Sequence, residues 1–175
     1  MKIKKYTDLN RKTIDEFRES EKFPIVVILE NIRSMHNVGS VFRTADAFLI
    51  SGIRLCGYTP KPPHRDIHKT ALGATDTVAW QYSEKTADAI NVLKQEGYKV
   101  FAVEQVEKSI SLRDFSYHRS EKIAVIFGNE VTGIEQEALN LCDGSIEIPQ
   151  YGMKHSLNIS VAAGIVLWEL VHKNI

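Results

Sequence analysis

The run PIVVILENI at residues 24–32 constrains the fold most, because its centre is apolar at every position. A strand with one face in water alternates apolar and polar side chains, whereas a strand buried on both faces is continuously apolar. Further short runs rich in β-formers follow, at 98–105 and 122–128 among others, and segments with helical spacing lie between them. The sequence therefore predicts an α/β domain with a mostly parallel sheet flanked by helices.

The boundaries of the elements follow from capping and turn residues. We expect strands at 24–32, 52–58, 78–82, 98–105, 122–128 and 145–149. A helix should follow the first strand with Asn37 as its N-cap, and another should run from a Ser83 cap to Gly97. Further helices are expected near 66–72, around 134–142 and at 156–173, the last with Ser156 as its N-cap. Residues 1–23 are interpreted as an N-terminal extension and 24–175 as the domain.

The last expected helix is apolar on nearly all of its sides. Leu157, Val161, Ile165 and Trp168 lie on one side, and further apolar residues lie on the others. A helix of this kind is buried all round, yet a terminal helix on a sheet leaves one face in water. We therefore predict a homodimer that forms through the C-terminal helix.

Composition narrows the functional classes only weakly. The chain of 175 residues has 22 basic and 22 acidic side chains, but residues 1–70 have a basic excess and residues 71–175 a matching acidic one. This asymmetry suggests a polyanionic partner, although chance scatter explains it as well. The sequence shows neither a membrane-spanning run nor a signal peptide, and Cys56 and Cys142 suggest free thiols, so we expect a cytoplasmic protein without membrane contact.

Ligands of open parallel sheets bind outside the carboxyl ends of the strands, which directs attention to four loops. These loops read NIRSMHN, EQVEKS, GNEVTG and PQYGMKHS. In the first, Arg33 and Arg43 flank a helix start that also offers free N–H groups, which suits an anion such as phosphate. Solvated arginines on a surface helix explain the same pattern equally well.

The other polar motifs carry less information by themselves. GNEVTG at 128–133 lacks the lysine of a P-loop, and a tight turn accounts for it. Capping accounts for Ser156, whereas the amide of Asn158, at the start of an apolar helix, needs a partner. His64 and His68 have metal-compatible spacing but no third ligand nearby, so no metal site is expected.

Three segments in this order resemble the SpoU/TrmH family of the SPOUT class. The first motif is Asn37, Gly39 and Arg43-Thr44-Ala45, and the second is Ile126-Phe127-Gly128-Asn129-Glu130 with Gly133. The third is Ile148-Pro149 followed by Ser156-Leu157-Asn158. The resemblance covers about residues 24–172. It implies a C-terminal trefoil knot, which is an exception to the rule that chains are unknotted.

The resemblance also implies an activity, S-adenosylmethionine-dependent methylation of an RNA ribose 2′-hydroxyl. The implied cofactor-binding residues are Val103, Glu104, Gly128, Ile148 and Leu157. The implied catalytic residues are Arg43, Asn37, Glu130, Ser156 and Asn158, with some of them acting across a dimer interface. Because arginine stays protonated, we expect Arg43 to hold a phosphate and stabilise developing alkoxide. RNA capture would then use Arg33, Arg54, Lys61, Arg65 and Lys69.

Several readings remain open at this stage. The RNA could be tRNA or rRNA, and tRNA is slightly favoured because a compact substrate suits a small protein. A non-catalytic RNA-binding module would keep the same fold, but the presence of Asn37, Arg43, Glu130 and Asn158 speaks against it. A nucleotide-binding regulator would normally present a lysine to phosphates, and these loops have none in such a place.

Overall fold

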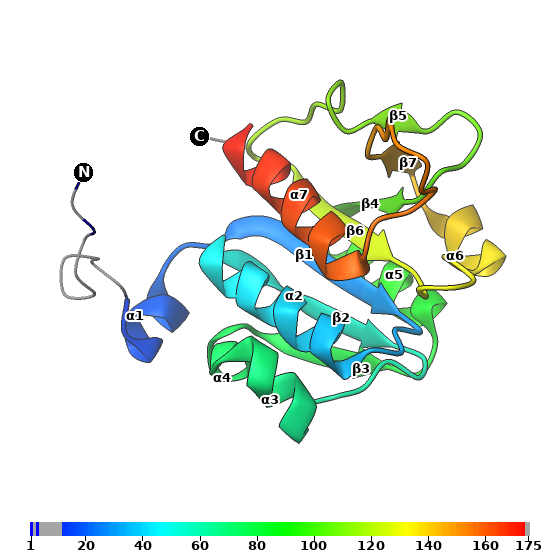
Figure 1. Cartoon of the computed structure of the whole chain (residues 1–175). Coiled ribbons are helices and arrows are strands. Elements are labelled where there is room, and N and C mark those ends of the chain that lie inside the picture. Colours follow the sequence, from blue (N-terminus) through cyan, green and yellow to red (C-terminus); the bar gives the residue numbers. More distant parts are fainter. Residues whose placement is uncertain (2, 4–11, 174–175) are drawn as a thin grey trace.

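The centre of the molecule is a seven-stranded parallel sheet in the order β3-β2-β1-β6-β4-β7-β5 (Figure 1). The structure, a computed structural model, describes residues 1, 3 and 12–173. The strands are β1 (Phe23–Glu30), β2 (Ile50–Cys56), β3 (Trp80–Ser83), β4 (Tyr98–Val103), β5 (Ile110–Ser111), β6 (Lys122–Phe127) and β7 (Gly144–Glu147). The predicted α/β class is confirmed, while the trefoil knot stays a prediction of the resemblance.

Helices cover both faces of this sheet. The helices are α1 (Ile14–Glu19), α2 (Met35–Ala47), α3 (Arg65–Ala71), α4 (Ala74–Thr77), α5 (Thr86–Gln95), α6 (Gln136–Leu141) and α7 (Ile159–His172). α2 and α7 lie side by side on one face, and α5 covers the other (Figure 1). The sheet separates two cores, a first core beneath α2 and α7 and a second core beneath α5. In β1, Val27 and Leu29 pack into the first core, while Val26 and Ile28 pack into the second. This burial on both faces explains the unbroken apolar run.

Three predicted helix starts are wrong. The N-cap of α2 is Ser34, whose side chain accepts from the backbone N–H of Asn37 at 3.2 Å. Ser83 is the last residue of β3, and α5 begins after Lys85 without a side-chain cap. α7 is capped by Asn158, not Ser156. For α2 and α7 two residues near the boundary were plausible caps by type, and the other contacts of Asn37 and Asn158 help to decide between them.

Other boundaries agree with the sequence to within a few residues, but two short elements were missed. These are the two-residue strand β5 and the single turn α4. Neither is long enough to show a hydrophobic period. Within the expected N-terminal extension the chain forms α1, whose Phe17 packs into the first core with 5% of its surface exposed.

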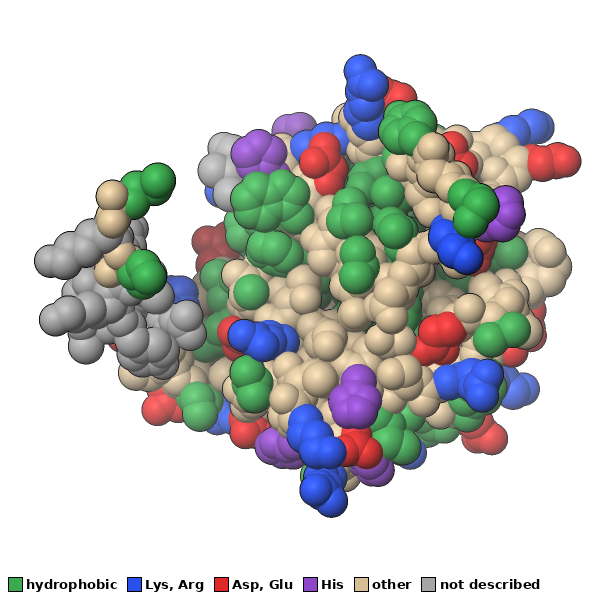
Figure 2. Space-filling view, viewed as in Figure 1, with side chains coloured by type: hydrophobic (Ala, Val, Ile, Leu, Met, Phe, Trp, Pro, Cys, Tyr) green, Lys and Arg blue, Asp and Glu red, His purple; other side chains and the backbone are tan. Residues whose placement is uncertain are grey.

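Helix α7 keeps a row of large apolar side chains on the surface. Its inner side buries residues such as Ala163, Val166 and Leu170 completely. On its outer side, Val161, Ile165 and Trp168 remain 50%, 39% and 58% exposed. Figure 2 shows hydrophobic side chains gathered over this helix. The single chain therefore buries only one side of this apolar helix and leaves its other side exposed.

Gly39 sets the close approach of α2 to α3, and this gives a test of the packing. A Cβ at this position would lie 2.1 Å from Thr70 Oγ1 and 2.3 Å from the carbonyl oxygen of Ile67. We expect Gly39→Ala to lower the free energy of unfolding by about 1–3 kcal/mol, because backbone atoms must move apart. The measurement is urea unfolding. Ser40→Ala, one position along, is the control and should change stability by less than about 0.5 kcal/mol.

Candidate active site

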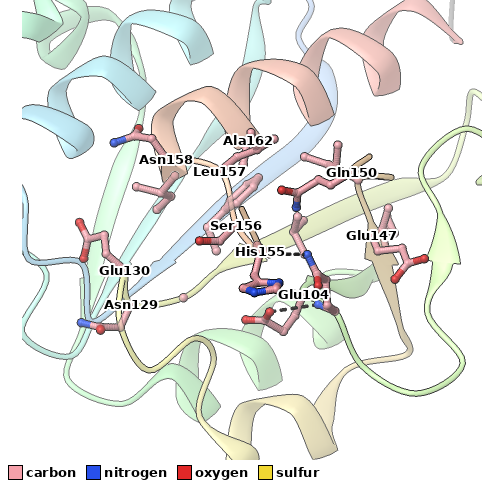
Figure 3. A pocket seen from close by; sticks show the side chains of 17 residues that line it. Glu104, Asn129, Glu130, Glu147, Gln150, His155, Ser156, Leu157, Asn158 and Ala162 are labelled. Carbon is pink, nitrogen blue, oxygen red and sulfur yellow. Dashed lines mark hydrogen bonds between the residues drawn. The ribbon is translucent and has the colours of Figure 1, made fainter. Parts of the chain in front are cut away.

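A cavity of about 310 Å³ opens at the carboxyl edge of the sheet (Figure 3). Its walls are the segments that follow β4, β6 and β7 together with the start of α7. All five residues that the resemblance assigns to the cofactor line it, namely Val103, Glu104, Gly128, Ile148 and Leu157. The strand-end rule and the motifs therefore point to the same place.

Much of the cavity wall is main chain, and the turn after β6 explains why. Asn129 and Gly133 exchange two backbone hydrogen bonds of 3.0 Å, which closes a tight turn. A Cβ on Gly128 would lie 2.4 Å from backbone atoms of Gly133 and Ile134. Gly133 itself has a φ of 71°. The glycines are thus required by the turn itself, quite apart from any ligand.

The carboxylate of Glu130 links this turn to the start of α2. It accepts from the backbone N–H of Arg33 at 3.0 Å, from that of Ser34 at 3.2 Å, and from Asn37 Nδ2 at 2.9 Å. Partial burial raises the pKa of Glu130, but these donors, led by the Arg33 N–H, outweigh it and the pKa is lowered overall. Glu130 therefore stays ionised and holds two loops together.

Asn37 extends this network to α7. Its Nδ2 donates to Glu130, and its Oδ1 accepts from Asn158 Nδ2 at 3.2 Å. Asn158 in turn caps α7 by accepting from the backbone N–H of Ser160 at 2.9 Å. The partner expected for the Asn158 amide is thus Asn37, and three motifs far apart in sequence meet through one chain of hydrogen bonds.

Ser156 and Arg43 complete the set of predicted catalytic residues but differ in position. Ser156 lines the cavity and is exposed. Arg43 lies exposed on α2, outside the cavity lining, and forms no hydrogen bond or ion pair with any described residue. A single chain therefore brings Asn37, Glu130, Ser156 and Asn158 to one site but not Arg43.

Four of the five cations expected to capture RNA are exposed. Arg33 precedes α2, Lys61 lies in the loop after β2, and Arg65 and Lys69 lie on α3. Lys69 also forms an ion pair with Asp66 at 2.7 Å. Arg54 differs, because its side chain is only 12% exposed within β2 and lies 3.9 Å from Glu96. Arg54 is therefore less accessible than the other four cations, and its guanidinium already has a carboxylate neighbour.

Asn31 links the loops around the site, a role that its sequence context did not predict. It directly follows β1 and has a φ of 54°, a backbone conformation that asparagine tolerates better than most residues. Its Oδ1 accepts from the N–H of Tyr58 at 3.2 Å, and its Nδ2 donates to Glu135 at 2.7 Å. Its carbonyl accepts from Asn129 Nδ2 at 2.8 Å. An asparagine directly after a buried strand was the available signal.

The chain matches the family model of the SpoU rRNA Methylase family over residues 24–168. It belongs to this family. A tRNA (guanosine(18)-2′-O)-methyltransferase of Thermus thermophilus is 32% identical over 95% of this chain and 84% of the relative. The Escherichia coli K12 enzyme of the same name is 33% identical over 83% of this chain, which spans 62% of that relative.

Solved structures of SpoU-type proteins superimpose well on this one. The A. aeolicus TrmH/SpoU tRNA modifying enzyme gives a TM-score of 0.81 at 26% identity, covering 91% of this chain and 80% of that chain. An AdoMet-bound rRNA methyltransferase from Sinorhizobium meliloti also gives 0.81, at 28% identity, covering 91% of this chain and 60% of that one.

The part of the chain that the structure describes holds neither a metal-ligand cluster nor a membrane-spanning helix. Residues 12–173 contain no cluster of three His, Cys, Asp or Glu side chains placed to hold a metal ion. His64 instead caps α3 by accepting from the N–H of Asp66 at 3.2 Å. No described helix has the length and apolar character needed to cross a membrane.

The lowered pKa of Glu130 predicts how its substitution depends on pH. A carboxylate whose pKa is depressed in the folded state stabilises the fold above its unfolded pKa of about 4.3, and this is lost as pH falls through the folded pKa. Glu130→Gln should therefore lower the free energy of unfolding at pH 7 by about 1 kcal/mol, since water screens part of the interaction.

Urea unfolding of both proteins between pH 7 and pH 3 measures this difference, which should shrink at the acid end. Glu107→Gln is the matched control, since Glu107 is exposed and bonds to no described residue. If the loss of unfolding free energy in Glu130→Gln stays constant with pH, the charge of Glu130 is not what stabilises the loops.

Proposed function

We propose that this chain is an S-adenosylmethionine-dependent RNA ribose 2′-O-methyltransferase that acts on tRNA as a homodimer. The observation that carries the proposal is the cavity beside the Asn37–Glu130–Asn158 network, in a chain of the SpoU family. The tRNA substrate is inferred from the relatives of T. thermophilus and E. coli, which are named for tRNA. We place the catalytic unit at residues 24–175 and the protein in the cytoplasm.

The cavity fits the methyl donor in size and chemistry. Small-molecule sites start at about 300 Å³ and combine apolar walls with a few fixed polar groups. Here Leu157, Ile148 and Val103 offer apolar surface for the adenine, and Glu104 and Gln150 offer acceptors and donors for hydroxyl and amino groups. Gln105 is held by donating from Nε2 to the carbonyl of His155 at 2.8 Å (Figure 3).

The protein's part in the reaction is to bind, orient and balance charge. When bound, S-adenosylmethionine supplies a methyl group on a positively charged sulfur. The ribose 2′-oxygen must lose its proton as it accepts the methyl group in line. A guanidinium remains protonated at neutral pH, so Arg43 stabilises the developing negative oxygen while the adjoining RNA phosphate takes the proton. Asn37, fixed by Glu130 and Asn158, orients the ribose.

Because Arg43 does not line the cavity of its own chain, we propose that a second copy supplies it. The exposed row of Val161, Ile165 and Trp168 on α7 is the surface that this copy would cover. α2 packs directly against α7, and Arg43 is exposed on α2, so we expect Arg43 to be within reach of a partner seated on this row. The dimer would thereby complete each site with a residue of the partner.

Methyl transfer from labelled S-adenosylmethionine to bulk tRNA, followed by identification of a 2′-O-methylnucleoside, tests the proposed activity. Within this assay Arg43→Lys should reduce kcat by about 100-fold or more, because an ammonium cannot replace a guanidinium fork on phosphate and alkoxide. Donor binding, measured by calorimetry, should be retained. Near-native kcat and pH–rate profile for Arg43→Lys would remove the need for a guanidinium.

Trp168→Glu tests the dimer. A carboxylate in the middle of the apolar row should convert the protein to a monomer in light-scattering measurements and abolish methyl transfer, while the donor still binds the cavity of each chain. Val92→Glu is the control, since Val92 is an exposed valine on α5, on the opposite face of the sheet. If monomeric Trp168→Glu were fully active, Arg43 would act on the cavity of its own chain, and the proposed sharing between two copies would be wrong.

A further inference from the structure

Two tyrosine side chains near the carboxyl edge of the sheet remain exposed. Tyr58, directly beyond β2, is 62% exposed, and Tyr82 in β3 is 40% exposed. Single exposed aromatic residues need no explanation, but these two are coupled. The Tyr82 hydroxyl donates to the carbonyl of Gly57 at 3.0 Å, next to Tyr58 in the chain.

Tyr58 is fixed at both of its ends. Its backbone N–H donates to Asn31 Oδ1 at 3.2 Å, and its hydroxyl oxygen accepts from Asn129 Nδ2 at 2.7 Å. Asn129 is itself anchored, because it is 6% exposed and its Oδ1 accepts from two backbone N–H groups of its turn. An exposed ring held in this way loses little conformational entropy when a ligand binds.

The hydrogen bond from Asn129 also locates Tyr58 relative to the proposed active site. Asn129 lines the cavity that we assign to the methyl donor. One side chain therefore separates the cavity wall from the exposed ring. A nucleotide that presents its ribose to the cavity would have its neighbours in the RNA chain at this ring.

The charges beside the rings favour a nucleic acid. Lys61 Nζ lies 3.7 Å from the centroid of the Tyr82 ring, so Lys61 covers Tyr82 and leaves Tyr58 as the open face. Arg33 is exposed on the neighbouring loop, whose backbone is held by Glu130. Aromatic faces interleaved with cations bind unpaired bases and their phosphates, and stacking tolerates any base.

We propose that Tyr58 stacks on an unpaired base next to the methylated nucleotide, while Lys61 and Arg33 contact the flanking phosphates. This inference rests on the proposed function and names the RNA contact that positions its substrate. It explains why a ring at this edge is exposed yet anchored by a buried asparagine.

A tryptophan placed in the ring position reports stacking directly. We expect the fluorescence of Tyr58→Trp to be quenched on addition of bulk tRNA beyond the change seen with the wild-type protein, which contains Trp80 and Trp168. Tyr98→Trp is the matched control. Tyr98 begins β4, at the amino ends of the strands and away from the proposed RNA contact, and Lys122 Nζ lies 5.5 Å from the centroid of its ring. Equal quenching in the two variants would overturn the proposal.

Kinetics separates stacking from the hydroxyl contact. Loss of one stacked base should raise the KM of Tyr58→Leu for tRNA by about 5- to 150-fold, with a smaller change in kcat. Tyr58→Phe keeps the ring and should raise KM less than Tyr58→Leu does. Equal KM values for the two variants would mean that the ring acts only by holding Asn129, and stacking would be wrong.

These measurements also distinguish the two proposals from each other. If the wild-type protein transfers no methyl group but tRNA still quenches Tyr58→Trp selectively, the enzymatic proposal is wrong and the RNA contact stands. If methyl transfer is normal and Tyr58→Leu has an unaltered KM, the enzymatic proposal stands and the RNA contact is wrong.

Discussion

The site depends on one carboxylate, that of Glu130, placed against the start of α2. The first N–H groups of a helix have no partner within the helix, and a negative charge near them is favourable. Glu130 satisfies backbone N–H groups just before the helix and fixes Asn37 in its first turn. Because Asn37 also accepts a hydrogen bond from Asn158, the start of α7 is linked to the same carboxylate. The cavity lies beside this network, between the segments that follow β4, β6 and β7 and the start of α7.

The sequence predicted the sheet and the location of the cavity because both follow from strong local patterns. Continuous apolar runs mark strands buried on two faces, and polar loops after such strands mark the edge where ligands bind. Helix starts were less predictable, since Ser34 and Asn37, or Ser156 and Asn158, are equally good caps by residue type. Which of them caps depends on partners more than ninety residues away, and a local pattern contains no such information.

The remaining differences between sequence and structure have the same origin. Arg54 was grouped with the cations expected to capture RNA, but within β2 its side chain is only 12% exposed and lies 3.9 Å from Glu96. The role of Asn31 arises from contacts with three other loops, which spacing along the chain does not reveal. Arg43 matched its motif, yet the fold of one chain leaves it outside the cavity, and its proposed role therefore belongs to the assembly.

The backbone turn between Asn129 and Gly133 has a consequence for the order of events. It forms part of the wall of the donor cavity and, through the Asn129 amide, it also holds the Tyr58 ring. A ligand that rigidifies this turn from the cavity side leaves less ordering for a ligand that arrives on the ring side, and the same holds in reverse. Two chemically unrelated molecules would thus promote each other's binding through a pentapeptide, with no large movement of the domain.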